Sequence, residues 1–319
     1  MQNADHRGKD LTLFVKNKML ASGFSACGVA KVENLQNAEK YFKSWLSQGF
    51  NGSMDYMGRN LDKRLDPSLI VPGAKSMVVA ALNCFPAEQQ NPKSSFFVSK
   101  YAYGADYHQV VKEKLYLVAA KIKTVVPSLE YKVFTDSAPV VEREWAVRAG
   151  LGWVGKNCCV ILPKMGSFFF LGGIISNMEL EPDEHFSKNL CGNCKKCMEA
   201  CPTSAIVSPG VVDSRRCISY LTIESKSPIP ASLRDKTSPW IFGCDTCQDV
   251  CPHNRFSSPS TEKAFTANGP ILEFDDENWL SVTEKTFQDC FAKDKSPISR
   301  VKFHKFADNI SAVKNSLKK

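Results

Sequence analysis

The sequence has no hydrophobic stretch that could cross a membrane and no apolar leader at its start. The longest apolar run, 168–175, is interrupted by two glycines and is far shorter than the roughly 20 residues that a membrane-spanning helix requires. The chain begins Met-Gln-Asn-Ala-Asp-His-Arg, without the hydrophobic core of a secretory signal. We therefore expect a cytoplasmic protein with no membrane partner, whose thiols stay reduced instead of forming a disulfide framework.

Apart from two similar cysteine motifs, internal repeats and low-complexity segments are also absent, and the composition is that of a soluble globular protein. The chain has 319 residues, of which 43% are hydrophobic and 23% charged, so it can bury a sizeable core and divide into two main parts. The formal charge of +8 favours a polyanionic partner such as nucleic acid, although charge alone is a weak indication. Eight Lys or Arg residues against two Asp fall in 293–319, which predicts either phosphate contact or a solvated helix face. Nothing requires an oligomer, and we expect a monomer.

Cysteine is the informative residue, because eight of the thirteen cysteines follow a recognisable spacing. The motifs are C-x2-C-x2-C-x3-C-P and C-x2-C-x3-C-P, with one cysteine between them. In bacterial ferredoxins with this spacing, three cysteines bind one [4Fe–4S] cluster and the fourth binds the other. We therefore predict cluster 1 on Cys191, Cys194, Cys197 and Cys251. Cluster 2 is predicted on Cys201, Cys217, Cys244 and Cys247, where Cys217 replaces the missing first member of the second motif.

Other uses of the cysteines explain the spacing less well. A zinc ion needs only two CxxC arms, whereas each group here continues to a further cysteine ahead of a proline. The C-x3-C-x2-C motif of radical-SAM enzymes is missing. The remaining cysteines are expected to be free thiols, mostly buried: Cys27, Cys84, Cys158, Cys159 and Cys290. Since Cys158 and Cys159 lie in an apolar run, we favour core packing over a redox pair.

Alternating strand and helix patterns predict an α/β layered domain in the first half of the chain. Apolar residues at helical spacing predict helices over 10–23, 38–48, 107–126 and 139–149. Short apolar runs predict strands over 25–32, 76–85, 131–135, 159–162 and 167–175, of which 76–85 has the pattern of a buried strand. From about residue 183, cysteines and short helices dominate. We predict an α/β domain over 1–182, a ferredoxin-like two-cluster domain over 183–260, and a basic C-terminal extension over 261–319.

Five segments, in order along the chain, point to one enzyme family. They are 136–143 (DSAPVVER), 148–157 (RAGLGWVGKN), 166–172 (GSFFFLG), 215–222 (RRCISYLT) and 243–252 (GCDTCQDVCP). With the cluster motifs, they resemble the epoxyqueuosine reductases over about residues 10–260. The resemblance implies an oxidoreductase of queuosine biosynthesis that reduces the epoxide of epoxyqueuosine at the tRNA wobble position. It also implies cobalamin bound in a nitroreductase-like core over 1–182, and an external low-potential electron donor.

Within this resemblance, Asp136 aligns with the family's proton donor and is also placed against the cobalamin. A carboxyl group at a strand end beside a bulky apolar macrocycle should lose hydration, which would raise its pKa and let it protonate an epoxide oxygen near neutral pH. The alternative is that Asp136 only caps the helix expected from about Pro139. His108 lies in a matching block, 101–108. It is expected either to bind substrate or order water, or to be a plain polar residue at a helix N-terminus.

The same resemblance assigns further residues to cobalamin. Arg59, Val160 and Leu171 correspond to residues that line the cofactor, and their alternatives are a surface charge for Arg59 and core packing for the other two. Lys156 and Asn157 follow a glycine-rich turn, where backbone can approach a ligand closely, and are placed at the edge of the cofactor or substrate. No histidine stands out as an axial ligand of the cobalt.

Two features depart from the family pattern. The chain reads Asp-Ser-Ala-Pro from Asp136 where Asp-Thr-Gly-Pro is typical, a change to small residues that leaves the aspartate in place. Many family members continue into a helical-repeat domain that helps to grip tRNA, and 261–319 has no room for one. We therefore expect the basic tail to take more of the phosphate contact, with binding that falls steeply with salt.

Two other functions remain open from the sequence. One is a related cobalamin reductase of a small molecule, similar to the reductive dehalogenases, and the other is a two-cluster electron carrier. Retained cobalamin would exclude the carrier, and a tRNA substrate would exclude the small-molecule reductase.

Overall fold

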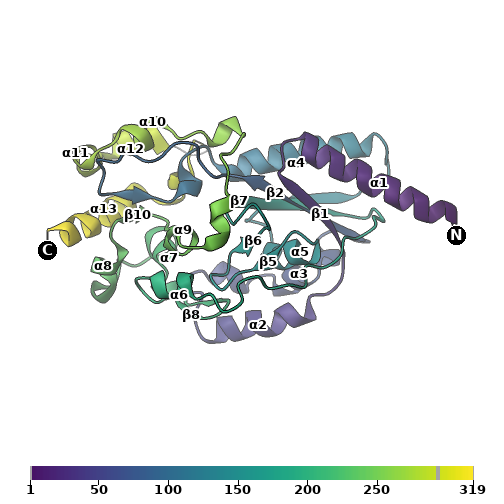
Figure 1. Ribbon diagram of the computed structural model, residues 1–319, viewed down its shortest axis with the longest axis horizontal. Helices are drawn as coiled ribbons and strands as arrows, with labels where there is room; N and C mark the ends of the chain where they lie inside the picture. Colours follow the sequence, from purple (N-terminus) through teal and green to yellow (C-terminus); the bar gives the residue numbers. More distant parts are fainter. Residues whose placement is uncertain (1, 292–294, 319) are drawn as a thin grey trace.

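A four-stranded sheet forms the frame of the first half of the chain (Figure 1). The computed structural model describes residues 2–291 and 295–318. In sheet order the strands are β1 (Ala26–Lys31), β2 (Ser76–Asn83), β7 (Phe169–Ser176) and β4 (Tyr131–Phe134). All neighbouring strands are antiparallel. Each of the four was predicted from the sequence, with bounds that differ by one or two residues.

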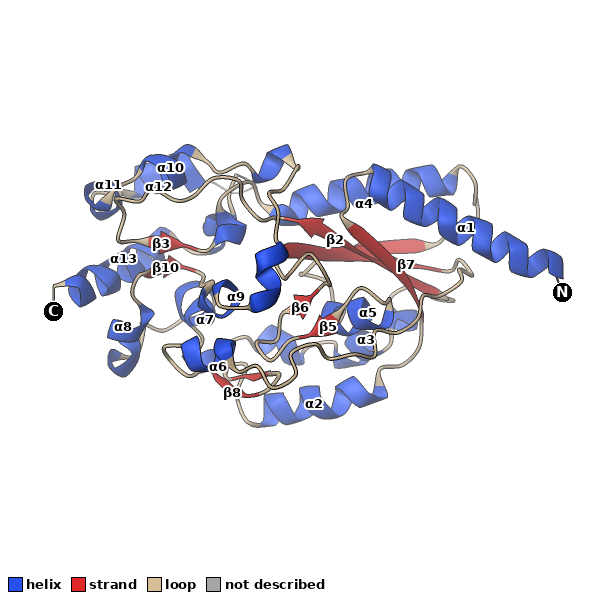
Figure 2. Ribbon diagram, in the orientation of Figure 1, coloured by secondary structure: helices blue, strands red, loops and turns tan. Residues whose placement is uncertain are grey.

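Helices cover both faces of this sheet (Figure 2). Helices α1 (Gln2–Ala21) and α4 (Tyr107–Lys123) pack on one face, and α3 (Leu61–Leu65) and α5 (Glu142–Arg148) on the other. Successive side chains of β2 alternate between the two cores, because side chains of a strand point to opposite faces. Val78, Ala80 and Leu82 join the core under α1 and α4, whereas Met77, Val79 and Ala81 join the other. The prediction of a buried strand is confirmed.

The remaining elements are short, apart from α2 and α13. They are α2 (Gln36–Ser47), β3 (Phe97–Val98), β5 (Trp153–Val154), β6 (Val160–Ile161), α6 (Lys196–Ala200), β8 (Ile206–Ser208), β9 (Val211–Val212), α7 (Ile218–Ile223), α8 (Ala231–Thr237), β10 (Trp240–Phe242), α9 (Thr246–Asp249), α10 (Gly269–Glu273), α11 (Asp276–Leu280), α12 (Glu284–Phe291) and α13 (Phe303–Leu317). The predicted change to short helices in the cysteine-rich segment is confirmed. Helix α1 begins well before residue 10, and α5 begins at Glu142, three residues after Pro139.

The C-terminal extension builds a third hydrophobic core with earlier parts of the chain. Phe306 of α13 and Trp279 of α11 are fully buried in this core, together with Phe96 and Phe242. Strand β10 pairs in parallel with β3. This pairing connects the cysteine-rich segment to the region of the chain before α4, next to the third core. Residues 295–318 of the basic tail are therefore part of the folded body. The domain boundaries at 182 and 260 stay a prediction, and hydrophobic contacts cross the second one.

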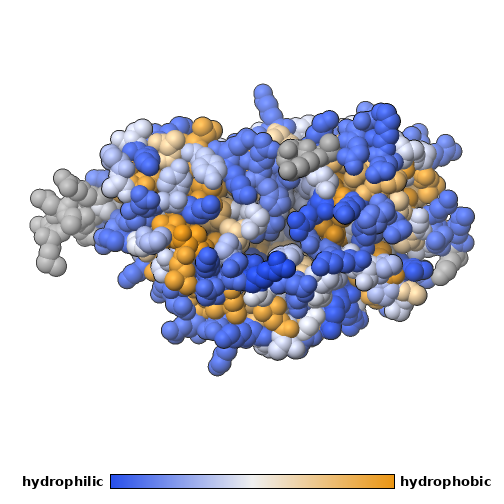
Figure 3. Space-filling view, turned by 180° about the vertical axis from the view of Figure 1, so that it is seen from behind, coloured by the Kyte–Doolittle hydropathy of each residue, from blue (hydrophilic) through white to orange (hydrophobic). Residues whose placement is uncertain are grey.

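Hydrophilic residues cover most of the face seen in Figure 3, and hydrophobic residues form smaller patches between them. Across residues 2–291 and 295–318, no helix is long and apolar enough to span a membrane.

Candidate active site and cluster centre

The main cavity lies at the end of the sheet where strands β2 and β4 finish and the antiparallel strand β7 begins. The antiparallel register places Asn83 opposite Phe169 and Phe134 opposite Gly173. The residues that follow β2 and β4 therefore lie at the same end of the sheet as the first residues of β7. The cavity has a volume of about 970 Å³, near the upper end of the range for small-molecule sites. Its wall combines the apolar run 168–171 with charged side chains, among them Asp136, Arg59 and Arg300.

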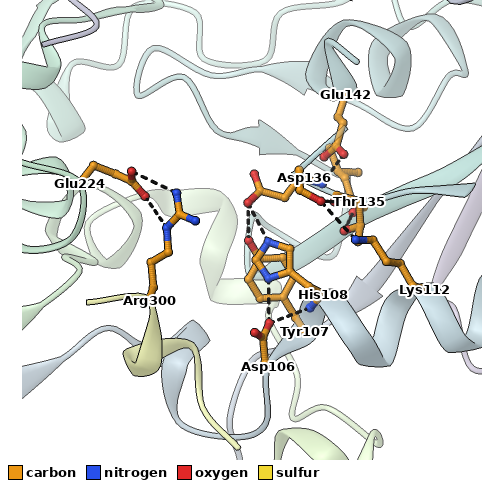
Figure 4. Close-up of polar contacts among 11 residues, drawn as sticks. Asp106, Tyr107, His108, Lys112, Thr135, Asp136, Glu142, Glu224 and Arg300 are labelled. Carbon is orange, nitrogen blue, oxygen red and sulfur yellow. Dashed lines mark hydrogen bonds and ion pairs between the residues drawn. The ribbon is translucent and has the colours of Figure 1, made fainter. Parts of the chain in front are cut away.

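A cluster of polar side chains surrounds Asp136 on this wall (Figure 4). The Tyr107 hydroxyl donates to Oδ2 of Asp136 at 2.9 Å, and Nε2 of His108 lies 3.0 Å from the same oxygen. The other ring nitrogen of His108, Nδ1, lies 2.7 Å from Oδ1 of Asp106. Asp106 also accepts the backbone N–H of His108 at 3.0 Å as the N-cap of α4. The start of one helix therefore positions both Tyr107 and His108 against Asp136.

The backbone of Asp136 excludes the alternative that this residue only caps a helix. The N-cap of α5 is Val141, and no side chain caps that helix. Asp136 has a φ of 51°, in the left-handed region that non-glycine residues rarely adopt. Its N–H donates to Oε1 of Glu142 at 2.5 Å, which holds the loop in this conformation. Backbone strain of this kind concentrates at functional sites.

The electrostatics of the pair place a proton between His108 and Asp136. Burial alone would lower the pKa of His108, but its hydrogen bonds to Asp106 and Asp136 outweigh burial and raise it to about 9. Although the Asp136 side chain is 62% exposed, the surrounding cavity walls partly desolvate it, which alone would raise its pKa; the hydrogen bond and charge of His108 outweigh this and lower the pKa. The expected rise in the pKa of Asp136 is therefore wrong, because a protonated imidazole lies beside the carboxylate. Burial and the nearby Asp136 raise the pKa of Glu142 to about 8.

Only some of the residues predicted to contact cobalamin line the main cavity. Arg59, Val160 and Leu171 line the cavity, and their contact with the cofactor stays a prediction. Within the described residues, the cavity wall includes neither Lys156 nor Asn157. The ammonium of Lys156 instead donates to backbone carbonyls in the cluster segment. Asn157 is buried, and its Oδ1 accepts the backbone N–H two residues ahead at 3.3 Å.

Sequence reasoning missed an ion pair that also faces the cavity. Arg300 donates from Nε and Nη2 to the two carboxylate oxygens of Glu224, at 3.0 and 3.2 Å. Glu224 lies two residues after the RRCISYLT segment, so proximity to that motif was the available signal. In the sequence, Arg300 is one of eight Lys or Arg residues in 293–319 and carries no separate signal.

The cysteines outside the cluster motifs differ in burial. Among the described residues no two cysteines are joined by a disulfide; of those outside the motifs, Cys84 is buried as expected, whereas Cys27 and Cys290 are half-buried. Cys158 and Cys159 are also half-buried and line the main cavity. The expectation that this adjacent pair packs in the core is therefore wrong.

The motif cysteines lie close enough to interact with one another's charges. Burial raises the pKa of Cys251, and the nearby Cys191 and Cys194 raise it further. Cys217 likewise lies close enough to Cys201 and Cys247 to interact with their charges. The structure thus brings Cys251 to the first group and Cys217 to the second, while the assignment to individual clusters stays a prediction.

Cysteine thiolates are the ligands that hold [4Fe–4S] clusters. Among the described residues, no three His, Cys, Asp or Glu side chains converge closely enough to hold one metal ion. The four sulfurs around a [4Fe–4S] cluster stand further apart than this, because each binds a different iron.

Comparison with known proteins identifies the family. A family model for a 4Fe-4S double cluster binding domain matches residues 190–254, and a model described as epoxyqueuosine reductase QueG, DUF1730, matches residues 64–137. An epoxyqueuosine reductase of Cyclobacterium marinum is 43% identical over 307 residues, which cover 95% of this chain and 97% of that protein. The chain belongs to the epoxyqueuosine reductase family.

Solved epoxyqueuosine reductases share the fold. One crystal structure, with an epoxyqueuosine-modified tRNA-Tyr stem loop, matches with a TM-score of 0.88 and 29% identity, covering 97% of this chain and 82% of that one. The Bacillus subtilis enzyme, solved with its aspartate-bearing catalytic loop swung out of the active site, matches with the same TM-score and 28% identity, covering 97% and 82%. The expectations of an oxidoreductase and of a mixed helix-and-strand fold with a double-cluster segment are confirmed. The nitroreductase-like character of the core stays a prediction.

Proposed function

We propose that this chain reduces the epoxide of epoxyqueuosine at the tRNA wobble position, giving queuosine and water. The related proteins are named epoxyqueuosine reductases, and one was crystallised with the modified tRNA stem loop. The observation that carries the proposal is the proton-bearing pair of His108 and Asp136 on the wall of a large cavity, beside the cysteines predicted to bind two clusters. We further propose that the enzyme acts in the cytoplasm, as a monomer, on tRNA made there.

Loss of the epoxide oxygen as water requires two electrons and two protons. Two [4Fe–4S] clusters would pass the electrons singly, taken from an external low-potential donor. Cluster 2 would be the nearer one to the substrate, since Cys217 lines a smaller cavity of about 300 Å³. This smaller cavity shares Tyr107, His108 and Asp136 with the main one. Electrons and protons would therefore arrive at the same wall.

The residues of the main cavity fit cobalamin, within the region 1–182 predicted to bind it. The cavity is large, and the run 168–171 together with Val160 gives it an apolar side for the macrocycle. Arg59 on the same wall can neutralise or hydrogen-bond polar substituents of the ring. When bound, cobalamin supplies a cobalt that accepts electrons singly and can reduce a carbon–oxygen bond, which side chains alone cannot do.

The side chains around Asp136 would supply and direct the proton. With a pKa of about 9, His108 is protonated at neutral pH and donates its Nε2–H to Asp136. Asp136 is 62% exposed and lines the cavity, so it can pass this proton to an epoxide oxygen. The Tyr107 hydroxyl fixes the orientation of the same carboxylate oxygen. A loop that swings in the Bacillus subtilis enzyme agrees with the strained backbone of Asp136 here.

Anaerobic turnover tests the proposal. The full chain with reconstituted clusters is incubated with a tRNA stem loop bearing epoxyqueuosine and a strong reductant, with and without cobalamin. The RNA is then digested, and the masses of its nucleosides are measured by mass spectrometry. We expect loss of one oxygen that depends on cobalamin. No conversion by protein that holds both clusters and cobalamin would favour the small-molecule reductase. Failure to bind cobalamin at all would favour the two-cluster carrier, although such a carrier has no use for the large cavity.

A further inference from the structure

The hairpin of β5 and β6 lies between the cavity and the cysteines predicted to bind cluster 1. The indole Nε1 of Trp153 donates to Sγ of Cys191 at 3.4 Å, within hydrogen-bonding distance for sulfur. The ring of Trp153 is buried and held in place by Phe186, stacked at 5.8 Å, and His253, edge-on at 4.8 Å. The direction of the N–H toward the sulfur is therefore set by packing on the faces of the ring.

Lys156 meets the same cysteine loop from the same hairpin. Its ammonium donates to the carbonyl of Gly192 at 2.7 Å and to the carbonyl of Cys194 at 2.8 Å. These carbonyls flank the first two predicted ligands of cluster 1. A positive charge is thus held against the backbone of the loop that carries Cys191 and Cys194.

The close packing of the hairpin holds both side chains on the cluster side. A Cβ on Gly152 would lie 2.0 Å from the carbonyl oxygen of Ile161, so only glycine lets the two strands approach here. The N–H of Gly155 donates to the carbonyl of Cys159 at 2.8 Å and closes the turn. The returning strand carries Val160 on the cavity wall. One rigid element therefore touches the cysteine loop with one strand and the cavity with the other.

We infer that Trp153 and Lys156 are positioning residues that set the reduction potential of cluster 1. The inference rests on the proposed function, in which cluster 1 accepts single electrons from an external donor and passes them to cluster 2. An N–H bonded to a ligand sulfur draws electron density from it, and a fixed positive charge stabilises the negative charge that the cluster gains. Both contacts favour the reduced cluster and raise its potential. The step is a transfer of one electron, in which no covalent bond forms or breaks.

Redox titration of the reconstituted full chain, followed by electron paramagnetic resonance, tests this inference without substrate. Trp153→Phe removes the N–H and keeps the aromatic packing, and Lys156→Gln removes the charge. A Cys217→Ala background, which lacks a ligand of cluster 2, isolates the signal of cluster 1. We expect each variant to lower the potential of cluster 1, and Lys156→Arg to restore most of it. The matched controls are Lys196→Gln, an exposed lysine beside Cys197, and Trp45→Phe, whose indole donates to a backbone carbonyl instead of a sulfur.

The outcomes separate the inference from a purely structural role and from the proposed function. An unchanged potential of cluster 1 in both variants, at full iron content, would overturn the inference. So would loss of iron from Lys156→Gln together with an unchanged potential in Trp153→Phe, since packing alone would explain that result. Wild-type protein that assembles no clusters would refute the electron relay itself. Shifted potentials without turnover of the tRNA stem loop would refute only the proposed substrate.

Discussion

Replacing Asp106 with Asn removes a charge from the active site and keeps the helix cap. Asn caps helices about as well as Asp, so α4 should still begin at Tyr107 and present His108 to Asp136. An Asn oxygen can also accept the hydrogen bond from Nδ1 of His108. The change therefore removes one of the two carboxylates that hold the imidazolium and leaves the geometry in place.

The size of the effect follows from the pKa of His108. At pH 7.5 an imidazole with the ordinary pKa of 6.5 is protonated in roughly a tenth of molecules, and one with a pKa of about 9 in more than nine-tenths. An adjacent carboxylate accounts for a shift of roughly one unit or more, so Asp106→Asn should bring the pKa of His108 to about 8. Because the pKa is raised on folding, the stability that the protonated pair contributes is fully present below about pH 6.5 and is lost as the pH rises through about 9.

The assay is the pH dependence of kcat/KM for reduction of the epoxyqueuosine stem loop. In the wild type, activity should fall above about pH 9, and in Asp106→Asn this fall should begin about one pH unit lower. At pH 8.5 the variant should be roughly threefold slower, while the two should nearly agree at pH 6.5. Asp275→Asn, a capping aspartate in α11, serves as the control and should leave the profile unchanged. An alkaline limb at the same pH in wild type and Asp106→Asn would refute the role of His108 as the proton source.

Other changes test separate parts of the structure. Asp136→Asn should keep both clusters and bound cobalamin yet lower turnover by roughly a hundredfold or more, and full activity in this variant would contradict its role in proton transfer. Cys217→Ala should halve the iron per chain and leave the spectrum of cluster 1, whereas unchanged iron would remove this residue from the ligand set. Phe306→Ala should lower the free energy of unfolding by about 3–5 kcal/mol in urea titrations, since its side chain is fully buried, and an unchanged midpoint would show that α13 is dispensable. Arg300→Gln should weaken binding of the stem loop and reduce the salt dependence by about one phosphate contact, and an identical salt slope would exclude that contact.

The parts of the protein that could be predicted from sequence carry short-range signals. The eight motif cysteines follow a spacing that reflects cluster geometry, and the strand over 76–85 reads as a continuous apolar run because it is buried on both faces. Asp136 was recognised from a contiguous segment at the end of a strand. Each of the two cysteine motifs and the apolar strand lies within about ten residues, whereas Cys217 and the role of Asp136 needed comparison with more distant segments.

The features that escaped prediction depend on residues far apart in the chain. The pKa of Asp136 moves opposite to the expected direction because His108, 28 residues earlier, lies against it. Lys156 points to the cysteine loop, since hairpin geometry and not the glycine-rich turn decides its direction. The C-terminal core was missed because its large side chains, such as Trp279 and Phe306, are separated by turns and are matched by partners in 96–103. For the same reason, the basic tail cannot be deleted to test tRNA binding without opening this core.

Helix α13 also bears on how the protein matures in the cell. The side-chain amide of Asn309 donates to the carbonyls of Thr222 and Ile241, at 2.8 and 3.0 Å, inside a buried site. These two carbonyls belong to the stretches that follow Cys217 and precede Cys244, so the last long helix braces the backbone between two predicted ligands of cluster 2. Until α13 has left the ribosome, a nascent chain holds these thiols on an unsupported backbone. We therefore expect the second cluster to be inserted only after α13 has packed against this backbone, so that its assembly waits for the segment that contains Asn309.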